Sequence, residues 1–572
     1  MRVYLPVLSL GLGCSVIVGA CGSNKAGSSG GADGGASDSS SDSSSSGGSS
    51  GGFLGDGSSP EAGPPADPTT CTAAAMQSSY LGCDYWPTVT ANNVWSVFDF
   101  AVVVANGGMA PATVTVTGGG TSIPPVTVAP GQLATIYLPW VSALKGADAD
   151  SCGDAVPLVA SVLQQGGAYH LVSSVPVTVY QFNALEYVGQ GGPSGKDWSM
   201  CPGNGVCGET GTPIGCYSFS NDASLLLPST AMTGNYRVTG HPTWDRSQGG
   251  TDAGSQADAG SDNLGAYVAI TATKDNTTVT LTVSSTGTVV AGTGITATAA
   301  GGTLTLTMNA GDVAELLGGS DAASDLSGSL IHADEPVQVI TGLPCLEVPD
   351  NVLACDHVEE SNFPAETFGQ DYIVAQPTGP RGNAVGQLVR IYGNFDGTNL
   401  SYIPGAPAGC PTTINAGQVV DCGIVNADFE IQGTNSFAVG VFSQGATAVD
   451  PSTQPPNEQG DPDQSLAIAV KQYRTKYVFL APTDYEDNYA VVVAPTGTTV
   501  SLDGAAATGS PTPLGSSGYG VLRLTLGAGQ AGAHVLTAPQ PVGLQVMGYG
   551  SYTSYMYPGG LDLAQIAPPP AN

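Results

Sequence analysis

Short segments that alternate polar and apolar residues constrain the fold of this chain more than any other feature. Those with a strict period of two are ATVTVTG (112–118), TTVTLTV (277–283), GTLTLTM (302–308), TTVSLDG (498–504) and VLRLTLG (521–527). A period of two is typical of antiparallel strands that bury one face. Because no segment of helical length carries a convincing 3.6-residue apolar stripe, we predict an all-β fold.

A turn motif recurs between such segments. Its copies are VAPGQL (128–133), MNAGDV (308–313), INAGQV (414–419) and LGAGQA (526–531). Each copy follows one apolar run and precedes another, so its Gly is expected at a hairpin corner that requires a positive φ. The spacing of these glycines indicates modules of about 110 residues, the size of a β-sandwich. The first interval carries additional loop.

We therefore expect tandem β-sandwich-like modules. A β-propeller-like array is the alternative, although a propeller blade needs only about 40–50 residues, so each module would have to supply two blades. The expected organisation is a signal peptide (1–20), a linker (21–70), four β-modules (71–215, 216–350 with a low-complexity loop at 245–263, 351–455 and 456–565) and a Pro-rich tail (566–572).

The N-terminus predicts export. Arg2 precedes an apolar run that is too short to remain as a membrane span, and the run ends in VGAC at 18–21. This ending resembles the lipobox of bacterial lipoproteins, which implies that Cys21 is lipidated. Gly22 is not the residue that retains such proteins at the inner membrane, so we expect an outer-membrane lipoprotein facing the cell surface or the periplasm. An ordinary signal peptide with an incidental Cys21 is the alternative.

The segment after Cys21 is predicted to be a disordered stalk. Residues 22–70 consist mostly of Ser, Gly, Asp, Ala and Pro. Such a segment buries too little apolar surface to offset the entropy cost of ordering. As a flexible coil it holds the folded part roughly 40 Å from the membrane.

Charge excludes one class of partner. The chain has 13 Lys and Arg against 46 Asp and Glu, a net charge of −33. A surface this acidic argues against binding nucleic acid. No cofactor motif is present, and we expect none to be bound.

The remaining cysteines favour disulfides. In an exported chain an even set of cysteines indicates disulfide bonds, whereas zinc sites need Cys and His at closer, defined spacings. Some are near neighbours in sequence, but the pairing as a whole stays open. The candidates are Cys71, Cys83, Cys152, Cys201, Cys207, Cys216, Cys345, Cys355, Cys410 and Cys422.

Several long segments resemble the IgGFc-binding family. They are PVTVYQFNALEY (176–187), NDASLLLPSTAMTGNY (221–236), DLSGSLIHADEPVQVITG (325–342), HVEESNFPAETFGQDYIVAQP (357–377) and DPDQSLAIAVKQYRTKYVFLAPTDY (461–485). The resemblance covers roughly residues 71–560. It implies extracellular binding and supplies no catalytic residues, although the Ser-rich stalk departs from the arrangement of the vertebrate protein that gives the family its name.

One stretch invites a catalytic interpretation. CDHVEES (355–361) places His357 beside Glu359 and Glu360, and a His with carboxylates can bind a metal or move protons. The spacing is not that of H-E-x-x-H. An extended strand puts His357 and Glu359 on one face and Glu360 on the other. The alternative is a structural loop held by Cys355.

Tyrosines near the C-terminus allow two interpretations. YGSYTSYMYPGG (549–560) mixes Tyr549, Tyr552, Tyr555 and Tyr557 with small residues. This composition is typical of adaptable binding surfaces. A buried terminal strand explains it equally well.

The sequence as a whole predicts a non-catalytic, multivalent surface protein that adheres to an extracellular glycoprotein or polysaccharide. A structural surface coat is one alternative. A secreted hydrolase that uses His357 and Glu359 is the other.

Overall fold

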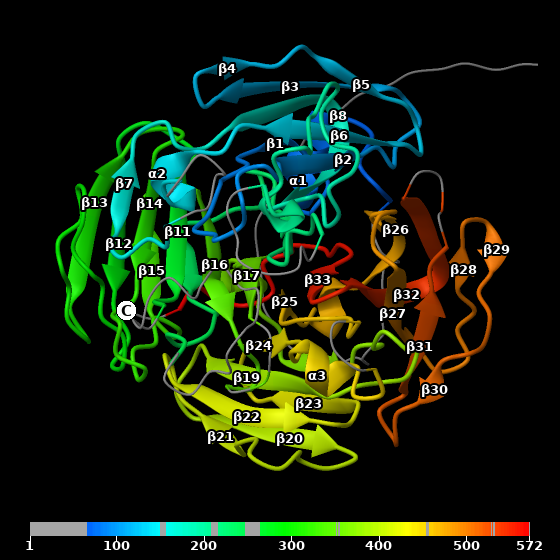
Figure 1. Ribbon diagram of the computed structural model, residues 1–572. Coiled ribbons are helices and arrows are strands. Elements are labelled where there is room, and N and C mark those ends of the chain that lie inside the picture. Colours follow the sequence, from blue (N-terminus) through cyan, green and yellow to red (C-terminus); the bar gives the residue numbers. More distant parts are fainter. Residues whose placement is uncertain are drawn as a thin grey trace, which may run out of the picture. The chain divides into compact units, whose positions relative to one another are not determined.

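Strands rich in Val, Thr, Tyr and Phe dominate the chain (Figure 1). The computed structural model describes residues 66–148, 156–206, 215–245, 264–350, 352, 355–453, 457–527, 529 and 532–570. The predicted leader, Cys21, the linker up to residue 65, the loop at 246–263, Cys152 and Cys207 lie outside the described residues. The all-β prediction is confirmed, and the α-helices that the structure describes have seven residues or fewer. None of these helices is long and apolar enough to span a membrane.

The strands fall into four consecutive groups along the chain, and the strands of each group follow one another in a similar arrangement. The first contains α1 (Cys71–Gln77), β1 (Gly82–Tyr85), β2 (Phe100–Ala105), β3 (Ala112–Gly118), β4 (Thr121–Ser122), β5 (Val126–Val128), β6 (Leu133–Leu138), α2 (Ser142–Lys145), β7 (Val162–Gln164), β8 (His170–Phe182), η1 (Pro202–Asn204) and β9 (Ala223–Leu226). The second contains β10 (Asn235–Arg237), β11 (Tyr267–Ala272), β12 (Thr277–Thr282), β13 (Thr303–Met308), β14 (Val313–Leu317), β15 (Leu330–Ala333), β16 (Val337–Leu346) and β17 (Asp356–Ser361).

The other two groups repeat this order. The third contains η3 (Ala365–Thr367), β18 (Asp371–Val374), β19 (Gln387–Gly393), β20 (Thr398–Ile403), β21 (Thr413–Ile414), β22 (Val419–Val425), β23 (Phe429–Gly433), β24 (Phe437–Phe442), α3 (Ala446–Val449) and β25 (Gln464–Leu466). The fourth contains η4 (Val470–Gln472), β26 (Arg474–Leu480), β27 (Asp487–Pro495), β28 (Ser501–Leu502), β29 (Ala505–Ala506), β30 (Thr512–Pro513), β31 (Tyr519–Thr525), β32 (Ala533–Gly550) and β33 (Thr553–Pro558).

Each group forms an outer and an inner antiparallel sheet. In the second group the outer sheet has the order β10-β15-β12-β13 and the inner sheet β17-β16-β11-β14, to which β7 of the first group adds at the β14 edge. In the third the orders are β18-β23-β20-β21 and β25-β24-β19-β22. In the first and fourth groups one long strand, β8 or β32, runs through both sheets and joins them into one eight-stranded sheet. These sheet pairs are the predicted sandwich-like modules.

Each module ends with a strand that lies innermost. β9, β17, β25 and β33 each pair with the preceding long strand of their own module. The expected boundaries after residues 215, 350 and 455 would assign β9, β17 and β25 to the following module. We propose module boundaries after these strands instead.

The innermost strands meet at the centre of the four modules (Figure 1). β9 contacts β17 and β33, and β25 contacts the same two strands, so the four strands form a ring. Contacts that involve residues near both ends of the described chain also join the first and fourth modules. Tyr80 N–H donates to the Leu561 carbonyl at 3.2 Å, and Arg474 pairs with Asp67 at 2.5 Å.

The recurring turn connects sheets and does not form a hairpin. The expected positive φ is present at Gly131, Gly311, Gly417 and Gly529. In the first three copies the chain passes from the outer to the inner sheet through a type II turn, for example with Gln132 N–H donating to the Ala129 carbonyl at 3.1 Å. Because the flanking strands pair with different partners, the predicted hairpin corner is wrong.

The fourth copy is not equivalent to the others. Gly529 lies between β31 and β32, which both pair with β27. In the first three modules the carbonyl of the residue after the turn glycine accepts from an N–H at the end of the inner strand that pairs with the following strand. In the first module Gln132 accepts from Asn106 N–H, directly after β2, at 3.0 Å. In the fourth module Gly518 fills this role, because its carbonyl accepts from Thr496 N–H at 2.8 Å.

Candidate functional site

A carboxylate lies at the centre of the ring of innermost strands. Asp222, directly before β9, accepts from the backbone N–H of Glu359 at 2.9 Å, of Gln464 at 3.1 Å and of Met556 at 3.4 Å. Asp222 also accepts from Ala223 N–H at 2.8 Å. These four N–H groups belong to β9, β17, β25 and β33, so one side chain joins all four modules.

The four donors occupy equivalent positions. Each is paired with the same position of its neighbouring strand, namely Ala223 with Phe182, Glu359 with Gly342, Gln464 with Phe442 and Met556 with Met547. Repetition of one module therefore makes four backbone N–H groups converge, and a single carboxylate accepts hydrogen bonds from all four. The sequence analysis missed Asp222. The available signal was an Asp at or directly before the start of three of the innermost strands, at Asp222, Asp356 and Asp463.

Other buried carboxyls surround Asp222. Asp356 accepts from Thr553 Oγ at 2.9 Å, and Asp463 accepts from Ser554 Oγ at 2.6 Å. Burial raises the pKa of the Asp222 and Asp356 carboxyls well above the usual range, and neighbouring N–H groups act in the opposite direction. The centre is thus a buried, acidic, hydrogen-bonded core.

His357 and Glu359 belong to this core. Both are fully buried, with Nε2 of His357 at 3.6 Å from Oε2 of Glu359. Oε2 of Glu359 accepts from Thr90 Oγ at 3.0 Å and from Asn183 Nδ2 at 2.6 Å, and Oε1 accepts from Gln181 Nε2 at 3.2 Å, so both oxygens already have donors. CDHVEES therefore contains an innermost strand, and the alternative of a structural loop is corrected. A macromolecular substrate has no access to either side chain.

Within the described part of the chain, no group of three His, Cys, Asp or Glu side chains is placed to hold a metal ion. His357 stacks near the ring of Tyr267, with the ring centroids 6.3 Å apart. Glu360 points away from this pair and accepts from Ser465 Oγ at 3.3 Å. The predicted split of the two glutamates between the faces of a strand fits these contacts.

A second buried carboxyl lies away from the centre. Glu186 is 4% exposed, its Oε2 accepts from Asp99 N–H at 2.9 Å, and its Oε1 has no hydrogen-bond partner among the described residues. Asp99 pairs with Lys196 at 2.7 Å. Burial, followed by the charge of Asp99, raises the pKa of Glu186 to about 8.

These carboxyls predict a stability that decreases with pH. A carboxyl whose pKa is higher in the folded than in the unfolded chain favours folding while it is protonated. Its contribution is complete below the unfolded pKa of about 4 and is lost as the pH rises through the folded value. For Glu186 that value is about 8, and burial raises the pKa of Glu430 to about 7.

We expect the free energy of unfolding to fall between about pH 6.5 and pH 9. Burial lowers the pKa of His241 to about 4. Its contribution to the pH dependence of stability therefore lies below this window. Urea titrations across the window measure the slope. Glu186→Gln is the control and should reduce the slope, whereas a slope of zero or of opposite sign in the native chain would contradict this expectation.

The C-terminal tyrosines form part of the core. Tyr549, Tyr555 and Tyr557 are completely buried. Tyr555 donates to Asn488 Oδ1 at 2.7 Å, and Tyr552 donates to Glu458 Oε2 at 2.6 Å. Of the two interpretations of this stretch, the buried terminal strand is confirmed.

Disulfides are confirmed for eight of the candidate cysteines. The bonds are Cys71–Cys83, Cys201–Cys216, Cys345–Cys355 and Cys410–Cys422. Three of them join near neighbours in sequence. Cys152 and Cys207 lie outside the described residues, and their pairing stays a prediction.

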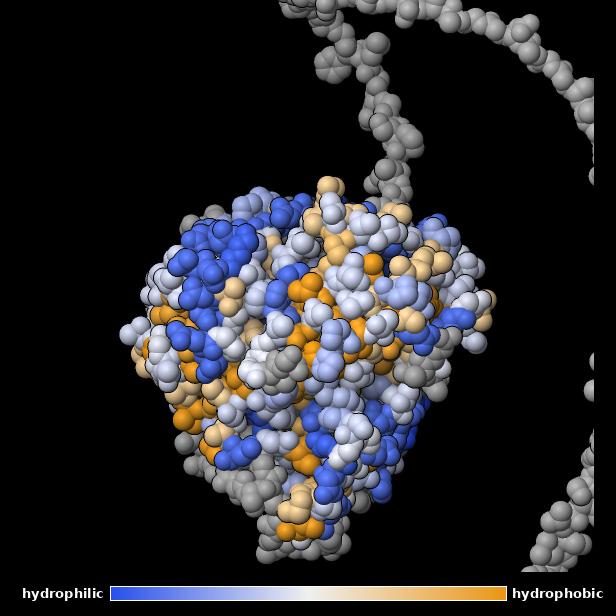
Figure 2. All heavy atoms as spheres, turned by 90° about the horizontal axis from the view of Figure 1, so that it is seen from above, coloured by the Kyte–Doolittle hydropathy of each residue, from blue (hydrophilic) through white to orange (hydrophobic). Residues whose placement is uncertain are grey.

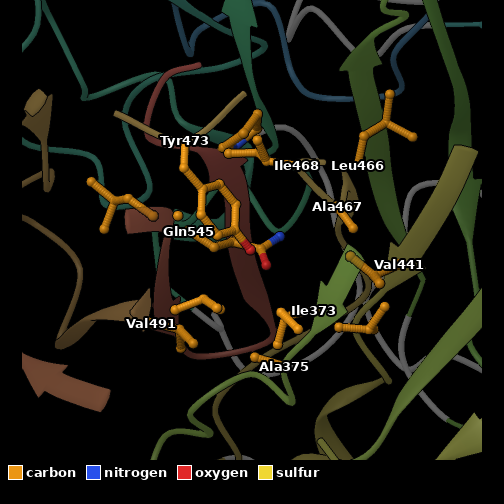
Figure 3. Close-up of a pocket in the computed structure, with 14 residues that line it drawn as sticks. Ile373, Ala375, Val441, Leu466, Ala467, Ile468, Tyr473, Val491 and Gln545 are labelled. Carbon is orange, nitrogen blue, oxygen red and sulfur yellow. The ribbon is translucent and has the colours of Figure 1, made fainter. Parts of the chain in front are cut away.

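A small apolar cavity lies between the third and fourth modules (Figure 3). The ring of Tyr473 and the amide of Gln545 lie among aliphatic side chains such as Ile373 and Val491. Its volume is about 30 Å³. A cavity of about 150 Å³ binds benzene, so this one is too small for an organic ligand of that size.

The described residues expose few large apolar side chains. Hydrophilic and hydrophobic residues are interspersed over the face that Figure 2 shows. Met76, Met109 and Val159 are at least 78% exposed. Scattered residues of this kind are normal on soluble surfaces and do not define a site.

The sequence matches a known family over residues 222–548, and this family is described as IgGFc binding protein. The matched range covers more than half of the chain. The chain belongs to the IgGFc-binding family. No curated protein and no solved structure matches the chain.

The IgGFc-binding match begins at Asp222 itself and ends in β32. It therefore includes the second and third modules and most of the fourth. The family is a binding family whose partner is an extracellular protein, and the four disulfides fit an extracellular or surface location.

Proposed function

We propose that this protein is a lipid-anchored surface protein that binds extracellular glycoprotein or polysaccharide without catalysis. Family membership supports the binding function. The observation that carries the non-catalytic assignment is the complete burial of His357 and Glu359, which were the best catalytic candidates. A hydrolase would have to expose such a pair.

Anchoring through Cys21 and display on the outer membrane are further parts of this proposal. A flexible stalk of roughly 40 Å would let the modules reach partners beyond the membrane surface. Repeated modules would then combine weak contacts into a stable attachment through a high effective concentration.

Retention of bait tests this function. Immobilised full-length protein is incubated with cell-envelope preparations, a matrix polysaccharide and a mucin-type glycoprotein, in separate experiments. We expect at least one bait to be retained at its original molecular mass. Recovery of shortened bait would support the hydrolase, and self-association without retention would support a structural coat.

A further inference from the structure

Inner-sheet strand β6 of the first module has a free edge that its counterparts lack. The modules share one register, since Leu133 pairs with Ala105 as Val313 pairs with Thr271, each directly after the type II turn. β6 therefore corresponds to β14, β22 and β31. No strand among the described residues pairs with the outer edge of β6.

The corresponding edges are covered in different ways. On β14, the cyan strand β7 lies beside the green module in Figure 1 and pairs Val162 with Glu315. On β31, β30 pairs Thr512 with Val521. On β22, the chain around Gly409 lies so close that a Cβ there would be 2.5 Å from the Cys422 carbonyl. A strand thus covers two of these three edges.

The direction of the free hydrogen-bonding groups follows from the turn. Asn106 N–H donates to the Gln132 carbonyl at 3.0 Å, which sets the alternation of the β2–β6 ladder. The backbone N–H and C=O groups of Ala134 and Ile136 then point towards β2, and those of Thr135 point towards the free edge. The same alternation holds in the second module, where Leu317, at the position of Tyr137, donates outward to Ser161 Oγ at 2.9 Å.

β6 also lacks the features that protect exposed edges. In native proteins, charged residues, Pro or a β-bulge usually prevent an edge strand from pairing with another chain. The sequence LATIYL contains neither charge nor Pro, and its pairing with β2 has no register shift. In contrast, β22 carries Asp421, a register shift and a disulfide at Cys422.

We propose that β6 is a docking edge on which an extended, basic segment of a partner protein adds as a further strand. This inference rests on the proposed binding function and assigns it a surface. Backbone hydrogen bonds to Leu133, Thr135 and Tyr137 would hold the segment, in the mode that β7 uses on β14.

Charge selects the class of partner. A net charge of −33 opposes pairing of β6 with a second copy of the same chain. A segment that carries Lys or Arg is instead attracted to a chain of this net charge.

A peptide with the sequence of residues 160–166, which include β7, tests the proposal. It is made with two flanking lysines on each side and, separately, with two flanking glutamates. We expect the lysine form to bind the full-length protein at least about tenfold more tightly. Hydrogen exchange should then slow at Thr135 and its outward-facing neighbours.

Thr135→Pro removes an outward N–H while leaving the ladder to β2 intact, and Pro is tolerated at sheet edges. We expect this variant to lose binding of the peptide, and Thr135→Val, which keeps the N–H, to retain it. A thermal unfolding curve confirms that both variants are folded. If Thr135→Pro is unfolded, the exchange data on the native chain decide.

Three results would overturn the proposal: slow exchange of Thr135 in the free protein, protection located on β14, or binding that survives Thr135→Pro in a folded variant. The bait experiment separates this site from the function. Retention of bait by both the native chain and Thr135→Pro would refute the docking edge and leave the binding function standing.

Discussion

Asp222→Ala is expected to destabilise the protein by about 4 kcal/mol or more. The substitution removes the acceptor for backbone N–H groups of Ala223, Glu359, Gln464 and Met556, all at the buried centre. Each buried donor left without a partner costs about 1–3 kcal/mol. Urea titration measures the loss as a lower midpoint with an unchanged slope.

Two further variants sharpen this prediction. Asp222→Asn keeps one acceptor oxygen but turns an amide donor towards N–H donors, so its loss should lie between those of the native chain and the Ala variant. Asp321→Ala is the matched control, because Asp321 is exposed and accepts from Ala323 N–H at 3.2 Å. An Asp222→Ala variant as stable as the control would refute the central role of this carboxylate.

Arg390→Met is expected to cost about 3–5 kcal/mol. Arg390 is 4% exposed, donates from its guanidinium to Asp325 at 2.6 Å and also binds the Gly240 carbonyl. Its removal leaves Asp325 of the neighbouring module as a buried, uncompensated charge. Breaking a buried pair in this way is far more costly than breaking an exposed one.

Lys274→Met provides the comparison. Lys274 pairs with Glu335 at 2.6 Å, but the two side chains are 58% and 40% exposed. Loss of this pair should change stability by less than about 1 kcal/mol. Equal effects of the two substitutions in urea titrations would contradict the assignment of Arg390 as a link between the second and third modules. Adding Asp325→Asn to Arg390→Met should restore part of the loss.

Local patterns predicted the strands well. ATVTVTG, TTVTLTV and GTLTLTM became β3, β12 and β13 because alternating Thr and Val suit a sheet with one solvated face. TTVSLDG was less reliable. Asp503 and Gly504, both with positive φ, end β28 after two residues and turn the chain into β29.

Long-range arrangement was less accessible from sequence. The motif containing Gly529 resembles the other turn motifs in sequence, yet the strands that it connects do not correspond to those in the other modules. A turn sequence does not specify which sheet the next strand joins. The role of Asp222 depends on strands more than 300 residues apart meeting at one point, as its contact with Met556 shows. The His357 and Glu359 pair likewise suggested chemistry until its burial was known.

Hydrogen exchange with a retained bait tests the account most directly, because it locates the function within the fold. We predict that amides of the innermost strands β9 and β17 exchange most slowly and do not respond to bait, since they hold the modules together. Protection should appear on outer elements, with β6 first among them. A bait-dependent change at residues 356–361, or bait recovered in shortened form, would contradict the account and return His357 and Glu359 to a functional role.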